Sequence, residues 1–153
     1  MKRQEISDFV RSVCSCLRLS QAKTLSVLVP AAMIVVRASL AQLGRELAGQ
    51  SALAAKQGIK RVDRFVGNTR VEPSEAMRGV VQWFAPPQKK LLMSLDWVDI
   101  RHFQCLVLAA RLRGRALPLL WAVYRYEDVY RSQNNLEYGL LRLFHTMAAA
   151  SVR

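Results

Sequence analysis

The chain has 153 residues, of which 52% are hydrophobic, and it carries 23 Lys and Arg against 11 Asp and Glu, a formal net charge of +12. This length and composition fit one ordinary globular domain or two small lobes, and they exclude a low-complexity chain. The excess of positive charge favours a polyanionic partner, with nucleic acid as the first candidate and a membrane surface as the second.

No segment is expected to cross a membrane. The most apolar run, residues 24–36, is flanked by Lys23 and Arg37 and contains Pro30. It is also shorter than the about 20 apolar residues that a membrane-spanning helix needs.

Export is not expected either. Glu5 and Asp8 stand where the apolar core of a signal peptide would begin. The chain has three cysteines, Cys14, Cys16 and Cys105. Their spacing is not that of a zinc site, so we expect free thiols in a reducing cytoplasm.

The first part of the chain predicts helices. A short helix is expected within residues 1–19, and a second over residues 20–36, where Pro30 should kink or divide it. Ser39 followed three residues later by Gln42 is a capping-box pattern, which opens a third helix.

Residues 58–67 form an amphipathic pattern that predicts a fourth helix. The expected inward stripe consists of Ile59, Val62, Phe65 and Val66. Lys60, Arg61 and Arg64 share the expected outer face. Two short helices, the second with a basic outer face, predict a helix-turn-helix whose reading helix covers residues 58–67.

Two features weaken this interpretation. The connection at residues 50–57 is longer than the usual tight turn, and a short basic helix is often an ordinary solvated surface. The net charge favours DNA contact over that alternative. Asn68 and Arg70, just beyond the helix, complete the DNA-binding residues expected here.

Pro73 is well placed as the first residue of a further helix. Its expected buried stripe is Met77, Val80, Val81 and Phe84. The Pro-Pro-Gln-Lys-Lys segment at residues 86–90 should end this helix and separate two lobes. We therefore expect a helical lobe at residues 1–88 and a sheet-containing lobe at residues 89–153.

The second lobe predicts an antiparallel sheet. Three apolar runs predict strands, at residues 91–99, 103–110 and 117–124. The links between them are too short for parallel crossovers, and Pro118 favours an edge position for the third strand. A helix opened by Asn134 or Asn135 should follow, which makes the fold class α+β.

Arginines gather at the second predicted hairpin, at Arg111, Arg113 and Arg115. They form either a solvated turn or a second set of phosphate contacts. The convergence of three arginines favours phosphate contact.

Asp96 follows a run of five residues of which four are strongly apolar, a pattern that predicts a strand buried on both faces. Burying a carboxylate at the end of such a strand is costly unless a partner compensates it, and a bound cation is a common partner. The alternative is that Asp96 caps the strand or pairs with an arginine. Asp99 is the weaker candidate, because it lies past the buried run.

Three antiparallel strands, a helix and an acid at the end of the first strand are the opening of a ribonuclease-H-like fold. The segments that narrow this match are residues 37–45, 59–65, 95–100 and 113–141. They resemble bacterial cut-and-paste DDE transposases of the insertion-sequence family four type, and Leu-Asp-Trp-Val-Asp-Ile at residues 95–100 is the most specific segment. The resemblance covers about residues 19–147. It implies a helical DNA-binding lobe followed by an incomplete ribonuclease-H-like core.

In that family, two Mg²⁺ ions are held by an Asp, a second Asp and a Glu, and they activate the attacking oxygen and stabilise the leaving one. The resemblance assigns Asp96 to the first acid, as both catalytic residue and metal ligand. Glu127, Asp128 and Glu137 do not match the other two acids. We therefore expect a truncated, catalytically incomplete transposase that holds Mg²⁺ weakly, if it holds the ion at all.

The resemblance also implies partners. These are double-stranded DNA at the terminal inverted repeats of the element, and a homodimer or a heterodimer with full-length transposase. The implied location is the bacterial cytoplasm, at the nucleoid. The alternatives are a non-catalytic DNA-binding repressor or dominant-negative fragment, and the remnant of a decayed reading frame. In the fold that the chain resembles, the first strand pairs on its far side with a fourth strand, which is not expected in this chain. Residues 91–97 should therefore present an unpaired edge that promotes self-association or low stability.

Overall fold

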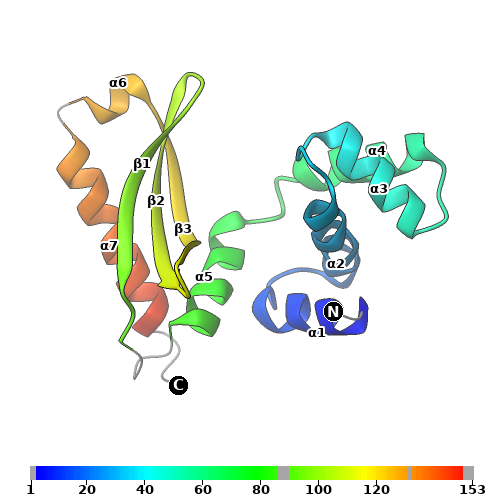
Figure 1. The fold of residues 1–153 in the computed structure, drawn as a ribbon, viewed down its shortest axis with the longest axis horizontal. Coiled ribbons are helices and arrows are strands. Elements are labelled where there is room, and N and C mark those ends of the chain that lie inside the picture. Colours follow the sequence, from blue (N-terminus) through cyan, green and yellow to red (C-terminus); the bar gives the residue numbers. More distant parts are fainter. Residues whose placement is uncertain (1–2, 86–89, 131, 150–153) are drawn as a thin grey trace. The chain divides into compact units, whose positions relative to one another are not determined.

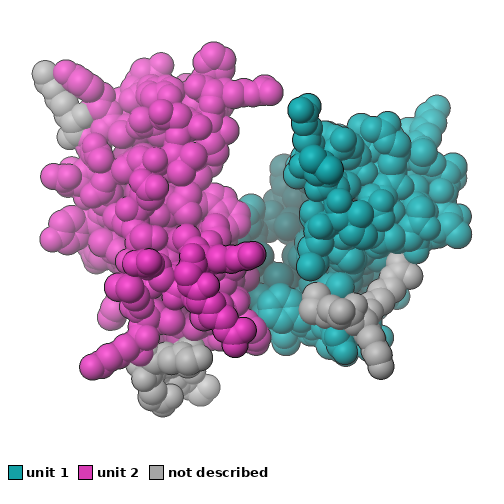
Figure 2. Space-filling model, in the orientation of Figure 1, with its two compact units in different colours: residues 1–76 teal, residues 77–153 magenta. Residues whose placement is uncertain are grey.

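The computed structural model describes residues 3–85, 90–130 and 132–149. In chain order it has five helices, three strands and two further helices, an α+β arrangement (Figure 1). The chain forms two compact units, residues 1–76 and residues 77–153 (Figure 2).

Unit 1 is helical, as the sequence predicts. Its four complete helices are α1 (Arg3–Val13), α2 (Leu19–Ile34), α3 (Leu40–Gln50) and α4 (Ala55–Val66). Pro30 lies inside α2 and does not divide it, because α2 is one helix that runs on to Ile34. The expected capping box at α3 is half formed. Ser39 Oγ accepts the N–H of Gln42 at 3.2 Å, but the Gln42 side chain accepts from the N–H of Arg37 instead.

The backbones of α3 and α4 touch at two glycines. A β-carbon built on Gly44 would collide with the Cα of Ile59, and one built on Gly58 would collide with the carbonyl oxygen of Gly44. Residues 51–54 form the turn between these helices, so it is shorter than the sequence suggested. Ala52 takes a positive φ of 52° in this turn. Short helices joined by so tight a turn are typical of a helix-turn-helix.

Helix α5 (Pro73–Phe84) begins at Pro73, as predicted, but most of it belongs with the sheet. Val81 and Ala85 are buried in the same cluster as the strands, with Met77, Val80 and Phe84 packed around them. The division between units therefore falls after Ala76, earlier than the expected division between residues 88 and 89. Residues 86–89 of the predicted boundary segment lie outside the described residues.

The sheet has the predicted antiparallel hairpins, in the order β1-β2-β3. Its strands are β1 (Met93–Ile100), β2 (Phe103–Leu112) and β3 (Arg115–Arg125). Leu108 pairs with Leu120 and Ala109 pairs with Pro118, so Leu119 is an extra residue in β3. This bulge lets both Leu119 and Leu120 be buried, next to the proline that the sequence places in an edge strand.

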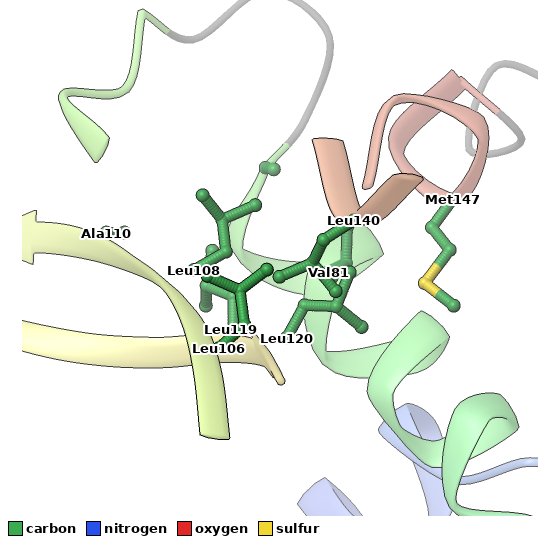
Figure 3. Close-up of a cluster of buried hydrophobic side chains, with 9 residues drawn as sticks. Val81, Leu106, Leu108, Ala110, Leu119, Leu120, Leu140 and Met147 are labelled. Carbon is green, nitrogen blue, oxygen red and sulfur yellow. The ribbon is translucent and has the colours of Figure 1, made fainter. Parts of the chain in front are cut away.

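One face of the sheet carries the core of unit 2. After the short helix α6 (Tyr126–Val129), α7 (Gln133–Ala149) packs with α5 against the same face. Leu106 and Leu108 of β2 meet Val81 of α5 and Leu140 of α7 in this cluster (Figure 3).

The opposite face of the sheet is open in the described part of unit 2. It carries exposed apolar side chains from all three strands, namely Val98, Ile100, Phe103, Trp121 and Val123. The prediction that the first strand is buried on both faces is therefore wrong. Strand β1 alternates instead, with Leu95 and Trp97 packed against the core and Asp96 and Val98 exposed.

Among the described residues, no helix combines the length and the apolar character that crossing a bilayer requires.

The glycine contact predicts a matched pair of variants. Gly58→Ala should lower the free energy of unfolding by about 1–3 kcal/mol, because the added methyl forces α3 and α4 apart. Gly49→Ala is the control, since a β-carbon there meets nothing within 4 Å. It should stabilise α3 by about 0.5–1 kcal/mol. Urea unfolding followed by circular dichroism measures both, and equal effects would contradict the contact.

Strand β1 is an edge strand, and one face of the sheet exposes apolar side chains. We therefore expect the protein to self-associate as its concentration rises. Val98→Lys should reduce self-association, because a charge on an edge strand opposes pairing with another chain. Leu141→Lys on α7 is the control, since Leu141 is 44% exposed and Val98 is 45% exposed. Light scattering across a concentration series measures the effect. A wild-type protein that stays monomeric throughout would contradict the expectation.

Candidate nucleic-acid interface and the Asp96 position

The outer face of α4 carries three cations in one row. Lys56, Lys60 and Arg64 are all exposed and are spaced four residues apart, which places them along one side of the helix. Val62, on the other side, is fully buried. The sequence pattern predicts that this helix begins at residue 58, so Lys56 falls outside the predicted basic face. The four-residue spacing of the basic residues was the signal that could have included it.

The expected inward stripe of α4 is only partly correct. Val62 is buried, and Ile59 and Phe65 are half-buried, but Val66 is 65% exposed. Val66 is the last residue of α4.

Arg61 does not share the outer face, contrary to the sequence prediction. Its Nε and Nη2 donate to Thr24 Oγ1 on α2, at 3.3 and 3.2 Å, and its side chain is half-buried. The helical period explains this, because Arg61 is one position round from Lys60 and so faces α2.

Asn68 and Arg70 lie in the turn after α4. Asn68 Oδ1 accepts the N–H of Arg70 at 3.1 Å, a local bond that holds the turn. Arg70 is exposed, and Asn68 is half-buried.

The second arginine group lies in unit 2, at the β2–β3 hairpin. Arg111 is near the end of β2, Arg115 begins β3, and all three arginines are exposed. Arg113 and Gly114 form the turn with φ of 49° and 78°. Positive φ at both positions matches the twist of an antiparallel hairpin. This group belongs to a different unit from α4.

Asp96 lies within β1 and not at its end, since the strand continues to Ile100. It is exposed on the open face, and its Oδ1 accepts the N–H of Trp97 at 2.9 Å. Val107 of β2 lies opposite it, and Trp121 of β3 lies opposite Val107. The expected burial of this carboxylate is therefore wrong.

Asp99 points to the other face and has partners of its own. Its Oδ1 accepts the Tyr126 hydroxyl at 3.0 Å and Gln104 Nε2 at 3.2 Å. The hydrogen bond to Asp99 raises the pKa of Tyr126 above its ordinary value, as do desolvation and the negative charge of Asp99. Three positions apart on one strand, Asp96 and Asp99 lie on opposite faces and cannot share one ion.

The remaining acids of unit 2 do not complete a metal site with Asp96. Glu137 on α7 accepts Trp97 Nε1 at 2.7 Å, on the core side of the sheet. In the part of the chain that the structure describes, no group of three or more His, Cys, Asp or Glu side chains could hold a metal ion. Mg²⁺ sites combine one or two carboxylates with waters and substrate oxygens, but a two-metal site needs several carboxylates, so the described residues do not form the two-metal site that the resemblance implies.

The cysteines are free thiols in the structure, as predicted. Burial raises the pKa of the Cys14 and Cys105 thiols, which keeps them protonated and unreactive near neutral pH.

Comparison of the chain with models of protein families, with curated proteins and with solved structures found no match.

Proposed function

We propose that this chain is a DNA-binding protein of the DDE transposase type, which binds the ends of a mobile element through α3 and α4. One observation carries the proposal: a tightly turned helix pair, held at two glycines, presents Lys56, Lys60 and Arg64 in one exposed row. The net charge of +12 supports a polyanionic partner.

The helix pair suits the major groove of DNA for a physical reason. The groove admits one α-helix, which needs a supporting helix behind it and polar side chains in front. Gly44 and Gly58 allow α3 to lie close behind α4. The exposed Lys60 and Arg64 are then available to phosphates or to guanine edges, for which Arg and Lys are the usual partners.

The sheet of unit 2 is proposed as the opening of a ribonuclease-H-like core, with Asp96 as the first of its three acids. An exposed carboxylate within a strand is accessible to an ion and to DNA. Because the described residues contain no group of three or more His, Cys, Asp or Glu side chains that could hold a metal ion, binding and not cleavage is the activity proposed for this chain.

The lone acid also favours a second candidate function. A chain that binds element ends without cutting them would repress transposition, either by occupying the ends or by joining a dimer with full-length transposase. The two candidate functions share the DNA interface. They differ in whether Asp96 takes part in a metal site together with other carboxylates.

DNA binding is tested with duplexes selected by the protein from a random pool. Lys60→Ala combined with Arg64→Ala should weaken binding by about tenfold or more, because two phosphate or base contacts are lost. Arg11→Ala combined with Arg142→Ala removes the same charge from exposed positions on α1 and α7 and should have a much smaller effect. Fluorescence anisotropy at fixed salt measures both. Equal losses would contradict a specific role for α4.

Cleavage is tested with the selected duplex and Mg²⁺. The chain alone should leave the DNA uncut, and Asp96→Ala should still bind the duplex, because the substitution leaves the cations of α4 in place. Addition of the chain to an active full-length transposase should lower cleavage if the repressor function holds. If the chain cuts DNA and the Asp96→Ala variant cuts equally well, the assignment of Asp96 is wrong.

A further inference from the structure

Unit 1 contains a pocket of about 410 Å³ between the first turns of α2 and the side of α4 that faces them. Seven of the residues around it carry polar side chains: Ser20, Gln21, Thr24, Gln57, Arg61, Arg64 and Asn68. None of the described residues that line the pocket carries a carboxylate. Both arginines come from α4, but only Arg64 also belongs to the exposed row of cations.

Arg61 is fixed in this pocket by a short chain of hydrogen bonds. Thr24 Oγ1 accepts from two guanidinium nitrogens of Arg61 and donates to the carbonyl of Ser20 at 3.0 Å. A guanidinium has five N–H donors, and these contacts occupy two of them. The remaining donors are held in one orientation, which lowers the entropy cost of binding a ligand.

Three amide side chains line the pocket, and two of them, Gln21 and Asn68, have their oxygen acceptors occupied, while Gln57 adds both a donor and an acceptor. Gln21 Oε1 accepts the N–H of Arg18 at 2.8 Å, and Asn68 Oδ1 accepts the N–H of Arg70. Each amide keeps its NH₂ group as a donor. The groups left in the pocket are therefore mainly donors and cations. The first turn of α2, with its partial positive charge, lies beside them.

A pocket of donors and cations without a carboxylate fits an anion with several oxygen acceptors. We propose that it holds a phosphate group of the DNA backbone, with Arg61 as the anchored ligand and Arg64 as the second. This inference rests on the proposed function and deepens it. The outer row of cations on α4 faces the major groove. The pocket binds a backbone phosphate of the adjacent DNA strand and so sets the position of α4.

The competing explanation is that Arg61 only joins α4 to α2. The two explanations differ in what the loss of one charge does to salt dependence. A phosphate contact contributes about −0.9 to the slope of log binding constant against log salt, whatever the sequence. A purely structural arginine changes the slope no more than any other surface cation does.

The test measures binding of the full chain to a selected duplex and a scrambled duplex over a salt series. Arg61→Ala should weaken binding to both by about tenfold and lower the slope by about 1. Lys23→Ala is the matched control, because it removes one exposed charge from α2 beside Thr24 and outside the pocket. Equal changes in the two variants would overturn the proposal.

A charge-neutral variant covers the case in which Arg61→Ala does not fold. Thr24→Val removes the acceptor that fixes Arg61 and should weaken binding several-fold, while Thr24→Ser should restore it. Circular dichroism and thermal melting confirm that each variant is folded. A folded Thr24→Val protein that binds as tightly as the wild type would also overturn the proposal.

Titration with inorganic phosphate separates this inference from the proposed function. In ¹H–¹⁵N spectra, the Arg61 Nε–H and the backbone amides of Ser20 and Gln21 should shift, and Arg61→Ala should abolish the amide shifts. If phosphate shifts these resonances but the protein binds no duplex, the anion pocket is supported and the DNA function is refuted. The opposite result has three parts: Lys60→Ala loses DNA binding, Arg61→Ala retains it, and phosphate causes no shifts in the wild type. That result would support the DNA function and refute the anion pocket.

Discussion

The contact between the backbones of α3 and α4 is the constraint on which unit 1 depends. Gly44 and Gly58 bring the two helices so close that neither position has room for a β-carbon. With α3 pressed against that side of α4, Lys56 and Lys60 can only lie on the exposed side. The same rotation turns Arg61 toward Thr24. One steric condition thus separates the cations of α4 into an outer row and an anchored pocket residue.

A second constraint, the alternation of side chains along β1, governs unit 2. Residues at odd positions from Met93 to Asp99 share the face that α5 and α7 cover, and Asp96 faces the open side. Asp99, although close in sequence, is used to hold Tyr126. Any acid that joins Asp96 must therefore approach from the open, apolar face. That face is also where the sheet lacks covering side chains in the described part of unit 2.

Local signals in the sequence predicted local structure well, and signals about packing less well. Pro73 at a helix start and the short links between strands depend on neighbouring residues, and the structure has both features. Burial of Asp96 depended on which elements cover the sheet, and a continuous apolar run does not reveal that. The position of Arg61 depended on how close α2 lies to α4, and the unit to which α5 belongs depended on its contacts with the strands. Such contacts between distant segments carry no signal in a single sequence.

DNA binding and two-metal DNA cleavage differ in how many structural elements they require. Binding DNA needs cations on one helix and a second helix close behind it, and unit 1 contains all of these residues. A two-metal site needs several carboxylates that converge from different elements onto one face of a sheet. Asp96 supplies one exposed carboxylate on the open face, while Glu137 and Asp99 are hydrogen-bonded on the opposite face. The charge and geometry of this chain therefore support a DNA-binding role that does not depend on catalysis.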